Sequence, residues 1–253
     1  GPKFSNPISS TDDINNIDTF DVNSLDYVFR AVEETKNLIP ANLPLIGFCG
    51  SPWTLAAYSI EGGGSKDFQK TKTFMAENPN ALHDFLEILS DACYQYLKQQ
   101  VLSGINAIQI FDSWADLLSE DELDLFSLSY TKKITQKLKN DPITKHIPII
   151  LFEKNPNKDI TDLIFKDLSC ISLYWNSDIR ILSESLKNDI AIQGNLDPKV
   201  LGKSDETIQE EVRKICSIMK GYPGFIFNLG HGITPDIEPA KVEVMIKTIR
   251  EDI

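Results

Sequence analysis

The sequence has 253 residues, of which 42% are apolar, and a formal net charge of −12. This length allows one large α/β domain or two small ones, with enough apolar content for a full core. The strong acidity and the presence of only four arginines argue against nucleic acid as a partner. No run of 18 apolar residues occurs, so no membrane-spanning segment is predicted, and the start lacks the features of a signal peptide.

Residues 1–23 are polar and are predicted to form a loop. Six apolar runs follow, each with a helix pattern behind it. The predicted strands are residues 45–49, 107–114, 147–152, 170–175, 190–195 and 224–229. Helices are expected near 25–32, from Pro52, over about 79–103, 120–139, 159–168, 178–188 and 204–220, and after Asp236.

Alternation of strands and helices at this spacing predicts a parallel sheet. Either the sheet is open and doubly wound, or it belongs to a (β/α)8 barrel. We favour the barrel, because no strand–helix turn carries GxGxxG and polar residues follow several strands. Six strands are two short of a barrel, and the chain starts abruptly at Gly1. We therefore expect one barrel domain over residues 1–253 that lacks its N-terminal part.

The four cysteines lie far apart, with no CxxC and no pairing with histidine. They are Cys49, Cys93, Cys170 and Cys216. Buried free thiols in a reducing cytoplasm are expected, rather than disulfides or a metal site.

Two strand ends carry turns that favour a ligand. Ser51 and Pro52 are predicted to begin a helix as N-cap and first residue, and such a helix N-terminus favours an anion. His231 lies between Gly230 and Gly232 after the last strand, where ligands bind in parallel α/β proteins. Glycine allows a sharp turn and a close approach. A structural turn with a solvated histidine is the alternative.

The strand ends supply polar side chains for three kinds of chemistry. Asp112 and Glu153 suit the paired carboxylates of a glycosidase. Ser113, His231 and Asp112 could form a nucleophilic triad, although the G-x-S-x-G elbow is missing. Tyr58, Ser113 and His231 could instead donate hydrogen bonds to an anionic ligand. Spacing does not decide among them, and structural hydrogen bonds remain an alternative for each residue.

Three stretches resemble the uroporphyrinogen decarboxylase family: GFCGSPWTLAAYSIEGGGSK at 47–66, IQIFDSWA at 108–115 and NLGHGI at 228–233. Residues 193–198 and 1–4 also look like family segments. The resemblance implies a (β/α)8 barrel that works as a cytoplasmic homodimer without metal or organic cofactor. It implies a carboxy-lyase that removes the four acetate carboxyl groups of uroporphyrinogen III, giving coproporphyrinogen III on the route to haem.

Carried over by motif, Tyr58, Ser113 and His231 would contact the substrate, and Gly62 to Gly64 would form a loop near the pocket. The family's Arg-x-x-x-Arg and Ser-Asp segments, which bind substrate carboxylates and the pyrrole N–H groups, have no match here. We expect them upstream, which would leave this chain inactive alone.

The chain also departs from the family pattern at Asp116, where Gly is usual, at Glu153–Asn155 and at Tyr174, where Asp is usual. Two rival functions remain. A corrinoid-dependent methyltransferase of the same superfamily would need a His-x-Cys zinc pair, which the sequence lacks. A catalytically dead barrel that only binds tetrapyrrole is the other.

Overall fold

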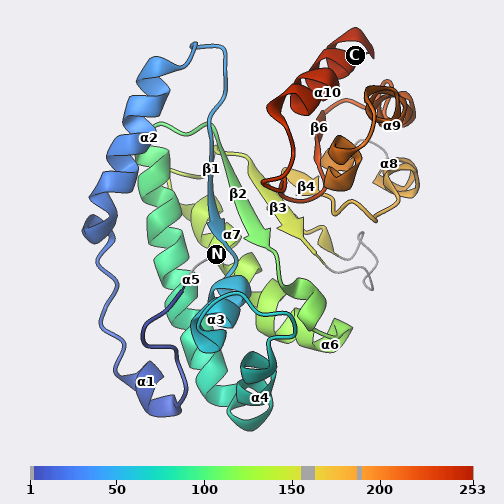
Figure 1. Ribbon diagram of the computed structural model, residues 1–253. Helices are drawn as coiled ribbons and strands as arrows, with labels where there is room; N and C mark the ends of the chain where they lie inside the picture. Colours follow the sequence, from blue (N-terminus) through green and yellow to red (C-terminus); the bar gives the residue numbers. More distant parts are fainter. Residues whose placement is uncertain (1–2, 155–162, 187–189, 253) are drawn as a thin grey trace.

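The computed structural model describes residues 3–154, 163–186 and 190–252, and its centre is one parallel sheet (Figure 1). The strands are β1 (Ile46–Gly50), β2 (Ala107–Asp112), β3 (Ile149–Glu153), β4 (Cys170–Ser172), β5 (Ala191–Leu196) and β6 (Phe225–Leu229). Each strand pairs with the next one along the chain, in the order β1-β2-β3-β4-β5-β6. A doubly wound sheet reverses its order at a switch point, whereas a (β/α)8 barrel keeps it. The predicted α/β fold is confirmed, with six parallel strands in barrel-type order and, in the described part of the chain, an α-helix after every strand except β3.

Helices flank the sheet along its length. Figure 1 shows α2 and α5 beside β1, and α8, α9 and α10 gathered beside the other end of the sheet. The α-helices are α1 (Thr11–Asn15), α2 (Asp26–Leu38), α3 (Pro52–Glu61), α4 (Gln69–Glu77), α5 (Pro79–Leu102), α6 (Glu120–Leu123), α7 (Ser129–Asn140), α8 (Ile179–Leu186), α9 (Asp205–Ile218) and α10 (Pro239–Asp252). None of these described helices is long and apolar enough to cross a membrane.

The strands present two different faces, because successive side chains point to opposite sides. One face is apolar and fully buried in the main core, as Ile108, Leu151 and Ile192 illustrate. The other face carries polar and aromatic side chains. There the Gln193 Nε2 donates to the Gln109 Oε1 at 3.3 Å and to the Ser172 Oγ at 3.0 Å. A polar face with internal hydrogen bonds is suited to line a binding site rather than a dry core.

The structure corrects three details of the prediction. Residues 1–23 are not all loop, because Ser10 and Asp13 form a capping box that starts α1 and buries Ile14. The helix expected over 120–139 is divided by a π-helical segment, Asp124–Leu128. The helix expected over 159–168 lies partly outside the described residues, and 163–168 contain no α-helix.

Candidate active site at the carboxyl ends of the strands

A cavity of about 430 Å³ opens on the polar face of the sheet. Its lining residues are Gln109, Phe111, Ser113, Phe152, Ser172, Asn228, Leu229, His231, Gly232 and Ile233. The structure thus brings the predicted residues Ser113 and His231, which follow β2 and β6, into one cavity. Its volume falls in the range of small-molecule sites.

The turn that carries His231 depends on one of its two glycines. The Gly230 amide donates to the Leu196 carbonyl at 2.8 Å, which ends β6 against β5. A Cβ on Gly230 would lie 2.3 Å from the backbone nitrogen of Trp175, so no side chain fits there. A Cβ on Gly232 would meet nothing within 4 Å. The close approach of the Trp175 backbone therefore explains the glycine at position 230, but it does not explain Gly232.

His231 is exposed at the rim of the cavity, between two aromatic rings. Its ring centre lies 5.9 Å from that of Tyr174 and 6.2 Å from that of Phe152, and both rings meet it edge-on. Partial burial lowers the pKa of His231, and the nearby Lys154 ammonium lowers it further, while the Asp116 carboxylate raises it. A lowered pKa favours the neutral imidazole near pH 7, and a neutral ring can both donate and accept a hydrogen bond.

The remaining polar groups of the cavity are neutral. Ser113 is half-buried, while Gln109 and Ser172 lie deeper and are almost fully buried. No carboxylate is among the described lining residues, although the chain as a whole carries a net charge of −12. Because an acidic ligand would be repelled by carboxylates at close range, a neutral lining is what such a ligand requires.

Tyr58 is not among the residues that line this cavity. It is half-buried on α3, with its ring centre 5.7 Å from that of Trp114 and 6.1 Å from that of Phe68. Trp114 follows Ser113 directly in the sequence. Tyr58 therefore contacts the residue next to Ser113 but does not itself line the cavity.

Asp112 faces away from the cavity, which argues against the glycosidase and triad hypotheses. Its Oδ1 accepts from the Ser51 Oγ at 2.8 Å and the Thr54 Oγ1 at 2.9 Å, and its Oδ2 accepts from the Ser127 Oγ. We call these four residues the buried hydroxyl cluster. Desolvation raises the pKa of Asp112, and the three hydroxyl groups oppose that change. Glu153 is also buried, at 3% exposure, and outside the lining.

The N-terminus of α3 has the predicted cap, since the Ser51 hydroxyl accepts from the Thr54 amide at 3.0 Å. This helix N-terminus was expected to favour an anion, and a carboxylate of the chain itself occupies that position. Asp112 of the chain itself lies against this helix N-terminus, and Ser51 is fully buried.

Beside the cavity lie Trp114, Asp116, Lys154 and Tyr174, none of which was predicted as a substrate contact. The Lys154 Nζ lies 2.9 Å from the Asp116 Oδ2, and it lies over the rings of Trp114 and Tyr174. We call Trp114, Asp116, Lys154, Tyr174 and His231 the rim cluster. Asp116 and Tyr174 were noted in the sequence as expected departures from the family pattern, and they could have drawn attention to this cluster. Nothing in the local sequence pattern connects the two positions, however.

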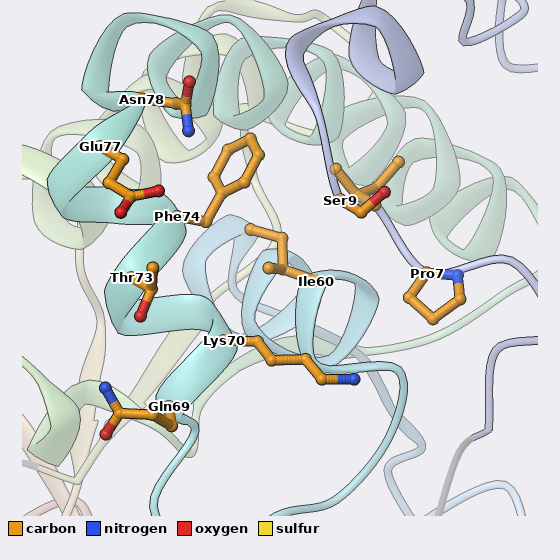
Figure 2. Close-up of a pocket in the computed structure, with 10 residues that line it drawn as sticks. Pro7, Ser9, Ile60, Gln69, Lys70, Thr73, Phe74, Glu77 and Asn78 are labelled. Atoms are coloured by element: carbon orange, nitrogen blue, oxygen red, sulfur yellow. The ribbon is translucent and has the colours of Figure 1, made fainter.

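Another cavity, of about 470 Å³, lies between the N-terminal segment and helices α3 and α4 (Figure 2). Figure 2 shows Ile60 and Phe74 side by side within it, with Lys70, Thr73 and Glu77 along α4. It contains none of the predicted site residues, and its apolar walls join the N-terminal segment to the helices.

The described residues contain no group of three or more His, Cys, Asp or Glu that could hold a metal ion. All four cysteines are buried free thiols. Burial strongly raises the pKa of Cys170, to about 12, which disfavours the thiolate that a metal or an electrophile would require.

Solved structures of low sequence identity share the fold. A methyltransferase from Methanosarcina mazei superposes with a TM-score of 0.68 at 18% identity, covering 88% of this chain and 63% of that chain. A B12-independent methionine synthase from Shewanella sp. W3-18-1 gives a TM-score of 0.57 at 12% identity, with 88% and 64% covered. At these identities the likeness establishes the architecture only.

Sequence relatives are much closer. The uroporphyrinogen decarboxylase of Vesicomyosocius okutanii is 43% identical over 249 residues, covering 98% of this chain and 71% of that protein. That of Ruthia magnifica is 41% identical, with 99% and 73% covered. The enzyme from Pseudomonas syringae is 38% identical, with 99% and 71% covered. The family model described as uroporphyrinogen decarboxylase matches residues 1–252. The chain belongs to the uroporphyrinogen decarboxylase family.

Proposed function

We propose that this chain is a carboxy-lyase that removes the four acetate carboxyl groups of uroporphyrinogen III to give coproporphyrinogen III. The observation that carries the proposal is the convergence of Ser113 and His231 in one neutral cavity at the carboxyl ends of the strands, in a chain that matches this family from end to end. We further propose that it works as a cytoplasmic homodimer without a metal or organic cofactor, on the basis of the family likeness.

The reaction breaks the bond between each acetate methylene and its carboxyl group. The bonding electrons need a sink, and a protonated pyrrole of the substrate itself can accept them. Carbon dioxide leaves, a proton then adds to the methylene to form a methyl group, and the ring releases the proton that it had gained. The protein must orient one carboxylate, stabilise the cationic ring and supply protons.

The cavity offers groups that orient a carboxylate and supply protons. The Ser113 hydroxyl and the neutral His231 ring can donate to a substrate carboxylate, and His231 can also pass on a proton near neutral pH. The rings of Phe111 and Phe152 supply flat apolar walls for a pyrrole ring. We keep Tyr58 as a proposed substrate contact, since its ring meets that of Trp114, the residue next to Ser113.

The test uses the protein together with the upstream segment expected from the family resemblance, because this chain alone is expected to be inactive. It is incubated with uroporphyrinogen III under anaerobic conditions, and the oxidised products are separated by chromatography. Appearance of coproporphyrin with loss of four carboxyl groups supports the proposal. Tight binding of the substrate without loss of any carboxyl group would overturn it in favour of a tetrapyrrole-binding barrel. Transfer of a methyl group from a methylcorrinoid would overturn it in favour of a methyltransferase.

A further inference from the structure

Lys154 is held far more tightly than an ordinary surface lysine. Its Nζ lies 2.9 Å from the Asp116 Oδ2, 5.3 Å from the centre of the Trp114 ring and 5.6 Å from the centre of the Tyr174 ring. Its side chain is 17% exposed. Lys133 makes the same kinds of contact, with Glu87 and with the Tyr130 ring at 4.8 Å, but its side chain is 46% exposed. The ammonium of Lys154 is thus partly desolvated, which strengthens both its ion pair and its ring contacts.

These contacts join three loops that follow neighbouring strands. Trp114 and Asp116 come after β2, Lys154 comes after β3, and Tyr174 comes after β4. The Lys154 amide also donates to the Asp112 carbonyl at 3.0 Å. A single side chain therefore ties together the part of the rim that faces His231.

The Tyr174 loop is the direct neighbour of the His231 turn. The Asn195 Nδ2 donates to the Tyr174 carbonyl at 3.0 Å, which fixes the backbone of that loop. The Tyr174 ring meets the His231 ring edge-on at 5.9 Å. The backbone of the next residue, Trp175, packs closely against Gly230, so the two loops are in direct contact.

Two of the positions at which the sequence departs from the family pattern, Asp116 and Tyr174, both contact this lysine. They are far apart in the sequence, and nothing in their local patterns links them. Their meeting at one ammonium indicates that the two departures belong together and have a common role.

We propose that Lys154 is a positioning residue of this site, which is paired with Asp116 and enclosed by Trp114 and Tyr174, and which holds the Tyr174 ring against His231. This role rests on the proposed function, because donating a proton to a bound carboxylate requires an imidazole that is held in a fixed position at the rim of the cavity. The placement itself is independent of any reaction.

The charges around His231 support this role. The Lys154 ammonium lowers the pKa of His231, and the Asp116 carboxylate raises it. The third titratable neighbour among the described residues is Tyr174, which is in ring contact. Lysine and aspartate therefore act on the same imidazole with opposite signs, and the pair moderates what either charge would do by itself.

The experiment is an NMR titration of His231 in the whole chain, with the signal assigned through His231→Gln. Lys154→Met keeps most of the side-chain volume but removes the charge, so the pKa of His231 is expected to rise. Asp116→Asn removes the opposite charge, so the pKa is expected to fall. Lys154→Arg is expected to preserve the titration, because a guanidinium can pair with the carboxylate and stack on the rings.

Lys133→Met is the matched control, since it removes a lysine with the same kinds of contact on α7 and is expected to leave His231 unchanged. The proposal is overturned if Lys154→Met and Asp116→Asn shift the pKa of His231 in the same direction. Such a result would indicate a general loosening of the rim, whose effect does not depend on the sign of the charge removed. So would a Lys154→Met variant that leaves the titration unmoved. If Lys154→Met does not fold, Asp116→Asn and Lys154→Arg decide the question. None of these readouts requires decarboxylation, so failure of the proposed function leaves the result interpretable.

Discussion

Asp112 and Asp116 belong to the same strand end but to two different clusters. Asp112 is fully buried, and it accepts hydrogen bonds from Ser51, Thr54 and Ser127. Asp116 is partly exposed, and it pairs with Lys154 at the rim of the cavity. The Asp112 carboxylate joins β2 to the surrounding helices, whereas the Asp116 carboxylate holds Lys154 at the rim of the cavity. The comparison teaches that the position of an acid, on the core face of the strand or in the turn beyond it, decides whether it serves the fold or the site, rather than the residue type.

The largest expected effect comes from His231 in the rim cluster. His231→Gln keeps a hydrogen-bonding amide but cannot take up or release a proton near neutral pH. We expect kcat/KM for decarboxylation to fall about 100-fold, the loss typical of a removed general acid or base. The free energy of unfolding should stay nearly the same, because the side chain is exposed. A large loss of stability in a denaturant titration would place His231 with the architectural residues instead.

The next effect comes from the buried hydroxyl cluster. Asp112→Ala leaves three hydroxyl groups without their acceptor and opens a small space between β2 and α3. We expect the free energy of unfolding to fall by about 3 kcal/mol, as for other broken buried networks. Urea unfolding followed by circular dichroism measures it. Unchanged stability together with lost activity would mean that Asp112 belongs to the site after all.

These two clusters show how much of the structure the sequence could predict. Parallel strands produce nearly continuous apolar runs, so all six strands and their order along the chain were predictable. The Ser51 cap was also predictable, because an N-cap depends on the residues at the start of the helix itself. The alternation along β2 also carried information, because Asp112 shares its face with Ile108 and Ile110, which are fully buried.

The rest depends on contacts between distant segments. Ser113 and His231 could be placed at the same end of the sheet, but the contact between the Tyr58 and Trp114 rings follows from side-chain packing. The contact between Lys154 and Asp116 joins two loops with no shared pattern. The His83 Nδ1 lies 2.6 Å from the Tyr130 Oη and its ring stacks on Phe126, and no local pattern indicates these contacts.

A smaller effect is expected at Ser113, which tests the cavity side of the same strand end. Ser113→Ala removes one hydroxyl that can donate to a substrate carboxylate. One hydrogen bond to a charged group corresponds to about 10-fold in kcat/KM. Ser127→Ala removes a hydroxyl of the buried hydroxyl cluster and is the matched control, expected to lower stability but to change KM little. Equal losses of activity in the two variants would erase the distinction between the clusters.

The smallest effect concerns the protonation of Asp112. Asp112→Asn keeps an oxygen that accepts from Ser51 and Thr54, and it places an amide nitrogen toward Ser127, whose hydroxyl can turn to accept. We expect a loss of about 1 kcal/mol or less at neutral pH, well below that of Asp112→Ala. Because desolvation raises the pKa of Asp112 above 3.8, the folded state holds this proton more tightly than the unfolded state.

The stability that protonated Asp112 contributes is therefore fully present below pH 3.8 and is lost as the pH rises through the folded-state pKa. Asp112→Asn has no such proton, so the stability of the wild type relative to this variant should decrease with rising pH and then level off. Urea titrations from pH 4 to pH 7 on both proteins measure the difference. A relative stability that increases with pH would mean that the three hydroxyl groups outweigh desolvation, and Asp112 would then be a carboxylate stabilised in its charged form.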